Sequence, residues 1–186
     1  MCGDPKDYTR CAVSYMPPSA GISVGDEHGS MDAGRDPVAV FEEFWELWTH
    51  LQGDSRAPGT VVVVEGERDR RSVRRLGLAG PIVLVHRGRT LSETAHYLAA
   101  NARRVIILTD WDTEGGHLAQ RLKEFLGAGR SGPDLEHRRR LARVLRGELV
   151  HVEGLYGWAL RAAEKANRSL VQLLESAEAE AEAATG

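Results

Sequence analysis

Three short apolar runs alternate with charged or amphipathic segments in the middle of the chain. The runs cover residues 60–64, 82–85 and 105–108, and β-branched or other aliphatic residues fill them. Continuous apolar runs of this length are typical of parallel strands that are buried on both faces. The segments between them, about 67–77 and 90–101, have the length and periodicity of helices. The alternation predicts right-handed βαβ units in which helices cover a parallel sheet.

Local signals predict further elements on both sides of these units. A helix is expected over residues 36–53, because an Asp-Pro pair is typical of a helix start. Its aromatic face is expected to pack in the core rather than stack on bases. Helices are also expected over about 116–126 and from Pro133 onward, and residues 149–152 predict a short fourth strand. The expected fold class is α/β, with a Rossmann-like, parallel four-stranded sheet flanked by helices.

The two ends of the chain differ from this core. Residues 1–35 are rich in Gly, Pro, Ser and Asp and show no sustained period, so a disordered or loosely ordered segment is expected. Met31 is an alternative start of translation. Residues 155–174 predict an amphipathic C-terminal helix, which either packs on the sheet or mediates contact with a partner or a second copy. The acidic tail over 175–186 is expected to fray.

Composition agrees with an ordinary globular protein of a reducing compartment. Of the 186 residues, 42% are hydrophobic and 27% are charged, and the two cysteines complete no zinc-binding pattern. No apolar run approaches the roughly 20 residues that a membrane-spanning helix needs. The N-terminus does not have the pattern of a secretory signal. A soluble, cytoplasmic protein without a membrane partner is therefore expected.

The net charge is −3, but the charges are distributed unevenly along the chain. Residues 56–146 hold 18 Lys or Arg against 10 Asp or Glu, whereas the flanking segments are both acidic. A basic core domain suits a polyanionic partner such as nucleic acid. The alternative is a solvated, arginine-rich surface without a partner.

Carboxylates follow two of the apolar runs directly. Glu65 comes after the first run and Asp110 after the third, with Asp112 two residues further on. Because the carboxyl ends of parallel strands meet at one edge of a sheet, these side chains are expected to converge. Converging carboxylates repel one another unless a cation lies between them. Oxygen ligands of this kind suit Mg²⁺, with Mn²⁺ as a substitute. For any single one of these acids, a helix cap is the alternative.

The two acidic motifs together resemble the Toprim (topoisomerase–primase) domain. The first is Val-Glu-Gly-Glu-Arg-Asp over residues 64–69, and the second is Asp-Trp-Asp-Thr-Glu-Gly over 110–115. The match covers about residues 58–152. Topoisomerases, bacterial-type primases, some nucleases and recombination proteins share this domain. Small stand-alone Toprim proteins, including archaeal ones and the nuclease that matures ribosomal RNA in some bacteria, are the nearest match.

The resemblance implies a role for each acidic residue. Asp110 and Asp112 would bind the divalent metal, with Glu114 as a third ligand, and Glu65 would act as the catalytic acid or base or as a further metal ligand. Three further residues are expected to position these side chains without contacting the metal themselves. They are Asp69, Gly66 and Gly115.

Arginines surround the motifs and are the expected contacts to nucleic-acid phosphates, because guanidinium groups bind phosphate in two-point fashion. A solvated helix face is the alternative for each cluster. The expected contacts are Arg68, Arg87, Arg89, Arg139, Arg143 and Arg146.

The predicted function is Mg²⁺-dependent phosphoryl transfer on nucleic acid, by a nuclease acting on RNA or DNA or by a primase-like enzyme. One alternative is a Toprim module that binds or recruits nucleic acid without cutting it. A weaker alternative is an unrelated metal-dependent phosphatase. A complete topoisomerase is not expected, because the chain has no room for the large domain that carries the nucleophilic tyrosine.

Overall fold

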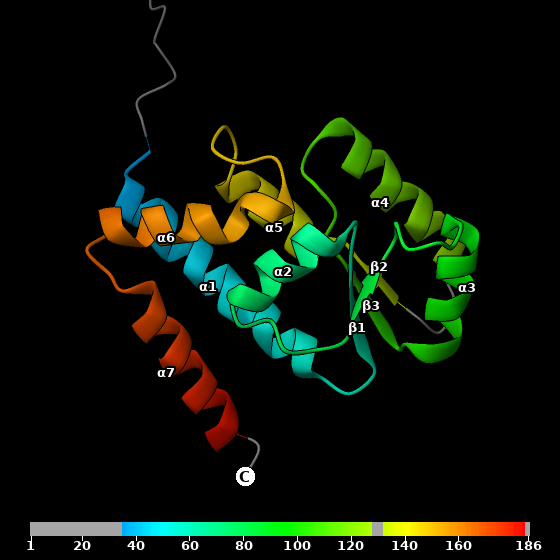
Figure 1. Ribbon diagram of the computed structural model, residues 1–186, viewed down its shortest axis with the longest axis horizontal. Helices are drawn as coiled ribbons and strands as arrows, with labels where there is room; N and C mark the ends of the chain where they lie inside the picture. The colour runs from blue at the N-terminus through cyan, green and yellow to red at the C-terminus, as the bar shows by residue number, and fades with distance from the viewer. Residues whose placement is uncertain (1–34, 128–131, 185–186) are drawn as a thin grey trace, which may run out of the picture. The chain divides into compact units, whose positions relative to one another are not determined.

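Four parallel strands lie at the centre of the fold in a computed structural model, which describes residues 35–127 and 132–184 (Figure 1). The expectations for residues 1–34, including a start at Met31, lie outside the described residues. The strands are β1 (Thr60–Val64), β2 (Ile82–Leu84), β3 (Arg104–Ile107) and β4 (Gly132–Asp134). The helices are α1 (Pro37–Arg56), α2 (Glu67–Arg75), α3 (Leu91–Asn101), α4 (Thr113–Leu126), α5 (Glu136–Val144), α6 (Leu155–Lys165) and α7 (Leu170–Ala183), with a 3-10 helix, η1 (Val152–Gly154).

The strand order is β2-β1-β3-β4, and every pair is parallel. In the register of the sheet, Val62 of β1 lies opposite Ile82 of β2 and Ile106 of β3. All residues of β1 are buried, as expected for a central strand covered on both faces. The predicted parallel α/β fold is therefore confirmed.

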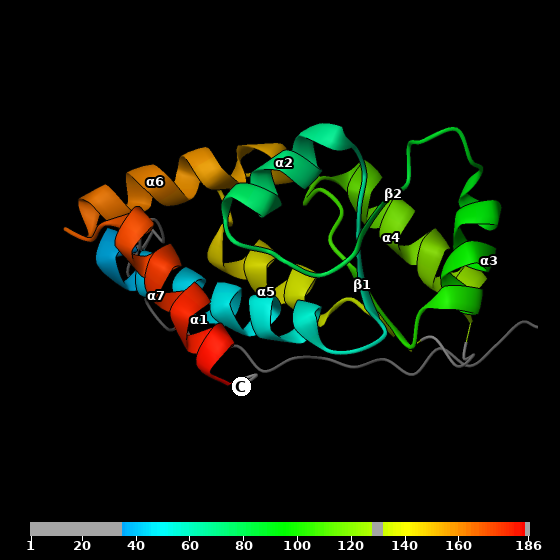
Figure 2. The ribbon, with the colours of Figure 1, turned by 60° about the horizontal axis from the view of Figure 1, so that its bottom comes forward.

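Successive side chains of β1 enter two separate hydrophobic clusters, because side chains alternate across a strand. Val61 and Val63 pack with residues of α3 and α4, including Leu98 and Leu122. Val62 and Val64 belong to the cluster on the other face, which draws on α1, α2, α5 and α6. Figures 1 and 2 show α3 and α4 on one side of the sheet and these other helices on the opposite side. Burial of each such side chain contributes about 1.5–3 kcal/mol, an upper estimate.

Helix α1 begins as the sequence predicts but runs further. The Asp36 side chain accepts a hydrogen bond from the Val38 N–H at 3.0 Å, and the helix continues through Gly53 to Arg56. Phe41, Phe44 and Trp48 are fully buried core residues, as expected, and Trp45 is partly buried and packs against the same cluster. Of the helices in the described ranges, none is both long and apolar enough to cross a lipid bilayer.

The prediction of a fourth strand over residues 149–152 is wrong. The fourth strand is β4, which pairs with β3 at the edge of the sheet and includes Pro133. An edge position suits proline, which has no N–H to donate to a neighbouring strand. The helix expected from Pro133 consequently starts only at Glu136. Residues 149–151 run beside the end of β3 instead, where the Trp111 N–H donates to the Val150 carbonyl at 2.8 Å.

The C-terminal region is two helices rather than one. The helix expected over 155–174 ends at Lys165, and a second helix extends from Leu170 to Ala183. Asn167 lies between them with a φ of 54°, a left-handed conformation that Asn tolerates better than most residues. The acidic segment that was expected to fray is therefore helical up to Ala183.

Candidate metal centre

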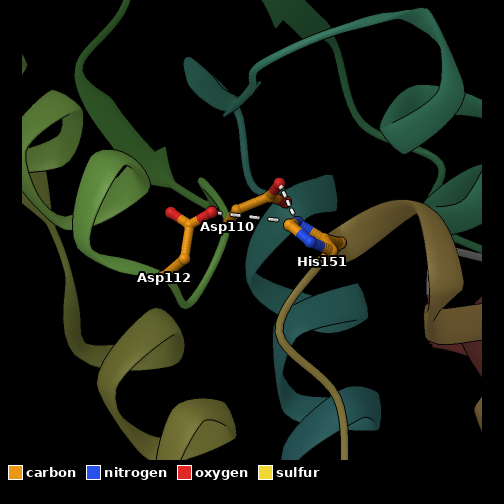
Figure 3. A group of neighbouring side chains, drawn as sticks. All are labelled: Asp110, Asp112 and His151. Atoms are coloured by element: carbon orange, nitrogen blue, oxygen red, sulfur yellow. Dashed lines mark hydrogen bonds and ion pairs between the residues drawn. The ribbon is translucent and has the colours of Figure 1, made fainter.

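Three side chains converge at the carboxyl end of β3: Asp110, Asp112 and His151 (Figure 3). Each offers one possible ligand atom, and these atoms all lie within 4.8 Å of one another. Asp110 follows β3, Asp112 is the N-cap of α4, and His151 immediately precedes η1. Figure 3 shows the two carboxylates next to the imidazole. The structure thus brings together the two aspartates that the sequence predicts with a histidine that the sequence did not indicate.

The Asp110 carboxylate is held through both of its oxygens. Oδ2 lies 2.8 Å from Nδ1 of His151, and Oδ1 accepts a hydrogen bond from the Val152 N–H at 2.8 Å. The hydrogen bond to Asp110 raises the pKa of the His151 imidazole above its ordinary value. The segment before η1 therefore closes one side of the centre and fixes the orientation of this carboxylate.

Asp112 is fixed by the start of α4. Its Oδ1 accepts a hydrogen bond from the Gly115 N–H at 2.7 Å, and its Oδ2 lies 3.9 Å from Nδ1 of His151. The backbone of Gly115 lies very close to the end of β3. A Cβ added at Gly115 would be only 2.3 Å from the Asp110 carbonyl oxygen. The Thr109 hydroxyl also donates to the Gly115 carbonyl at 2.8 Å. The absence of a side chain at Gly115 therefore lets the two aspartates share one tight turn.

Glu65 lies beside this group, at the end of β1. Its Oε1 accepts a hydrogen bond from the Asp110 N–H at 3.0 Å, which ties the ends of the two central strands together. Its Oε2 lies 3.7 Å from Nε2 of His86. Burial raises the pKa of the Glu65 carboxyl above its ordinary value, although the hydrogen bond from Asp110 opposes the shift. A carboxyl group with a raised pKa is suited to accept and release a proton.

Asp69 holds the turn that follows Glu65. It is buried, and its Oδ2 accepts a hydrogen bond from the Gly66 N–H at 2.8 Å. Burial raises the pKa of the Asp69 carboxyl. Asp69 and Gly66 therefore fix the start of α2.

Glu114 is separate from the three converging side chains. It lies in the first turn of α4 with an exposed side chain, next in sequence to the glycine that packs on the strand. Acidic residues in this position interact favourably with the helix dipole. Within the ranges that the structure describes, the candidate metal-binding group consists of Asp110, Asp112 and His151, and Glu114 is not among its members.

The predicted phosphate-binding arginines differ in their contacts. Arg68 lies 3.7 Å from the Glu153 carboxylate, and Arg139 pairs with Glu136 at 2.7 Å within α5. The guanidinium of Arg89 lies over the Tyr97 ring at 4.7 Å. The remaining candidates are exposed; they are Arg87, Arg143 and Arg146.

Arg138 has a distinct role that its neighbours in the sequence do not share. Its Nε donates to the Thr109 hydroxyl at 3.0 Å and to the Thr109 carbonyl at 3.2 Å, and its Nη2 donates to the Asp110 carbonyl. A half-buried guanidinium from α5 thereby anchors the end of β3. In sequence it is one arginine of a run of three, so no local signal distinguishes it.

The three side chains suit a divalent cation. Two adjacent carboxylates repel one another, and a cation between them removes that cost. Carboxylate oxygens are ligands of both Mg²⁺ and Mn²⁺, whereas imidazole favours Mn²⁺ or another transition metal over Mg²⁺. The donor set of two oxygens and one nitrogen therefore fits the divalent-metal site that the sequence predicts.

Comparisons with known proteins agree with this arrangement. Residues 60–144 match the sequence profile of the Toprim domain. The UPF0292 protein of Methanosarcina acetivorans is 37% identical over 131 residues, which are 70% of this chain and 90% of the relative. That of Thermococcus kodakarensis is 37% identical over 122 residues, covering 66% of this chain and 90% of the relative.

A solved structure is also similar. A protein from Aquifex aeolicus matches with a TM-score of 0.50 and 25% identity, over 58% of this chain and 94% of its own length. The α/β arrangement, the acidic motifs and the sequence relatives point to the same family. This chain belongs to the family of the archaeal UPF0292 proteins, and its residues 60–144 form a Toprim domain.

Proposed function

We propose that this protein is a divalent-metal-dependent nuclease that cleaves RNA or DNA, with Asp110, Asp112 and His151 as the metal ligands. The observation that carries the proposal is their convergence within 4.8 Å at the carboxyl end of the central strands. The Toprim family supports it, because Toprim domains bind divalent metal and act on nucleic acid. Mn²⁺ or Mg²⁺ is the proposed cofactor.

The cation would supply charge neutralisation on a phosphate group and would favour ionisation of an attacking water or hydroxyl. The chain's own residues hold the two carboxylates in place. Asp110 is oriented by His151 and the Val152 N–H, and Asp112 is oriented by the Gly115 N–H. These contacts preorganise the two carboxylates before any ligand arrives, which lowers the cost of binding.

Glu65 is the proposed proton carrier. Its Oε1 is fixed by the Asp110 N–H, so the carboxyl group stays beside the metal ligands. Its raised pKa brings the protonated and ionised forms closer in free energy near neutral pH. Glu65 can therefore take a proton from a nucleophile or give one to a leaving oxygen.

The experiment that tests the function is a cleavage assay on labelled single-stranded and duplex RNA and DNA, with Mg²⁺ or Mn²⁺. The Asp110→Asn, Asp112→Asn double variant is compared with the wild type. A Glu175→Gln, Glu178→Gln double variant on the exposed face of α7 is the matched control for loss of two carboxylates.

Cleavage by the wild type and the control, but not by the Asp110 and Asp112 double variant, is the expected result. Equal cleavage by the double variant would show that the assigned site is wrong. If the wild type binds metal yet cleaves none of the substrates, the protein acts as a recruiting module instead of a nuclease.

A further inference from the structure

A cavity of about 600 Å³ lies between α2, η1 and α6. Among the described residues, its lining is dominated by arginines, with one aromatic ring and one carboxylate. These residues are Arg68, Arg71, Arg75, Arg161, Tyr156 and Glu153. Arg161 comes from α6, far in sequence from the three arginines of α2, so the cluster exists only in the folded chain.

The arginines of α2 fall into two groups. Those that face away from the cavity have partners: Arg70 pairs with Glu67 at 2.6 Å, and Arg74 donates to the Leu78 carbonyl. Within residues 35–127 and 132–184, no carboxylate forms an ion pair with the cavity residues Arg71, Arg75 or Arg161.

Arg68 lies 3.7 Å from Glu153, a long contact on a side chain that is 77% exposed. The cavity therefore gathers positive charge that Glu153 does not balance. Neighbouring cations repel one another, and an anion bound between them removes this cost. The charge distribution favours an anionic occupant.

Tyr156 gives the cavity a second kind of contact. The guanidinium of Arg75 lies 3.6 Å from the centre of the Tyr156 ring, and Leu149 adds an apolar side chain to the wall. Planar guanidinium groups and aromatic rings are the side chains on which unpaired bases stack. Inorganic anions alone would use none of these apolar contacts.

We propose that this cavity binds a single strand of nucleic acid, through phosphates on the arginines and a base against Tyr156 and Arg75. The proposal rests on the proposed function, since the strand would be the substrate of the same site. Guanidinium groups bind phosphate oxygens in two-point fashion, which suits a row of them to a polynucleotide backbone. A single strand is favoured over a duplex, because bases paired inside a duplex cannot reach a side-chain ring.

Short stretches of chain connect the cavity lining to the residues of the candidate metal centre. Glu153 is two residues after His151, and Arg68 lies in the first turn of the helix that follows Glu65. The helix rise of about 1.5 Å per residue places Arg68 and Arg75 about 10 Å apart along the axis. The row of arginines can therefore contact successive phosphates of one strand.

The test is fluorescence anisotropy of labelled single-stranded RNA and DNA in EDTA, so that binding is measured without metal. The variant is Arg71→Ala, Arg75→Ala, Arg161→Ala. The control removes the same charge elsewhere, by Arg56→Ala, Arg103→Ala, Arg121→Ala. Arg56 and Arg103 lie near the amino ends of β1 and β3, opposite the site, and Arg121 is exposed on α4. Inorganic phosphate and a mononucleotide are added as competitors.

The cavity variant is expected to bind about tenfold more weakly, and its salt dependence is expected to fall by about 2 in log–log slope, since each lost contact contributes about 0.7. The control should change affinity less than about threefold, as expected for diffuse charge. Wild-type affinity in the cavity variant, or equal losses in both variants, would overturn the proposal. Competition by phosphate or mononucleotide at the same concentration as the oligonucleotide would also overturn it in favour of a small-anion site.

Mn²⁺ binding of the cavity variant, measured by calorimetry, separates this inference from the proposed function. If the wild type does not cleave while the cavity variant loses strand binding, the nuclease proposal fails and the cavity proposal stands. If the wild type cleaves and the cavity variant binds normally, the cavity proposal fails alone. Unchanged Mn²⁺ affinity in the cavity variant is expected in either case, because none of the three arginines is a metal ligand.

Discussion

Nδ1 of His151 lies 2.8 Å from Oδ2 of Asp110, although 41 residues separate them in the sequence. The contact joins the end of a central strand to the segment that leads into η1. It adds a nitrogen donor to a centre that the acidic motifs alone would make entirely of oxygen. This difference in donor atoms leads us to expect a preference among divalent metals, which can be measured.

His151→Ala is expected to weaken Mn²⁺ binding by about tenfold and Mg²⁺ binding less, because imidazole is a better ligand for Mn²⁺. Pulsed EPR of the wild type loaded with Mn²⁺ should show coupling to a coordinated imidazole nitrogen, and the variant should lack it. His96→Ala, on the exposed face of α3, is the control. Wild-type nitrogen coupling in the His151 variant would exclude this residue as a ligand.

Glu65→Gln is expected to separate metal binding from catalysis. The amide oxygen can still accept the hydrogen bond from the Asp110 N–H, so Mn²⁺ affinity should change less than about threefold. Cleavage should fall by about 100-fold or more, because the amide cannot transfer the proton. Calorimetry and single-turnover cleavage measure the two effects, with Glu67→Gln as the control on the exposed start of α2. A variant that cleaves at the wild-type rate would remove Glu65 from the mechanism.

Gly115→Ala and Gly116→Ala are a matched pair. The new Cβ at Gly115 would lie 2.3 Å from the Asp110 carbonyl oxygen, whereas at Gly116 the nearest group is the Arg138 side chain at 3.7 Å. The first change should lower the free energy of unfolding by about 1–3 kcal/mol through overpacking. The second should be neutral or slightly stabilising, because alanine favours a helix. Urea unfolding measures both, and equal stabilities would contradict the close approach at Gly115.

The stability of the fold should depend on pH through Asp54. Its Oδ2 accepts a hydrogen bond from Arg104 at 2.8 Å and lies 2.8 Å from Nε2 of His137. The hydrogen bond from Arg104 lowers the pKa of the Asp54 carboxyl below its ordinary value. The lower pKa in the folded state means that the ionised Asp54 carboxylate stabilises the fold. This stabilisation is complete above the pKa of Asp in the unfolded chain, about 3.9, and is lost as the pH falls through the pKa of Asp54 in the folded protein.

Asp54→Asn removes this contribution. Urea unfolding at pH 7 should therefore show the variant to be less stable than the wild type, and the difference should shrink below about pH 4. The control is Glu42→Gln, since Glu42 pairs with Arg168 where both side chains are about half exposed. Exposed pairs of this kind contribute little. A difference that stayed constant down to pH 2 would contradict the role of the Asp54 charge.

The sequence predicted the central strands and two of the converging side chains because these features are local. Continuous apolar runs identify β1 and β3. In a parallel sheet, the residues that follow such strands lie at the same edge, the carboxyl edge. Asp110 and Asp112 could therefore be placed from sequence alone. The Thr90–Glu93 capping box at the start of α3 is equally local, and the structure contains it.

The parts that the sequence did not indicate depend on contacts distant in the chain. β4 consists of Gly, Pro and Asp, without an apolar residue, so no pattern marks it as a strand. The apolar residues of 149–152 suggested a strand there instead, and the sequence did not single out His151 within it. The break between α6 and α7 is different, because its signals are local and could have been found in the sequence. Asn is common where a helix ends, and Ser169 is a favourable N-cap for the helix that follows.

The most direct test of the central claim is a titration with Mn²⁺, followed by EPR of the free ion, on the wild type and on the Asp110→Asn, Asp112→Asn double variant. The wild type should bind Mn²⁺ saturably, and the double variant should bind it at least about 100-fold more weakly, because two charged ligands are lost. Circular dichroism should show the double variant to be folded. Equal affinity in the two proteins would place the metal elsewhere and contradict the account of this site.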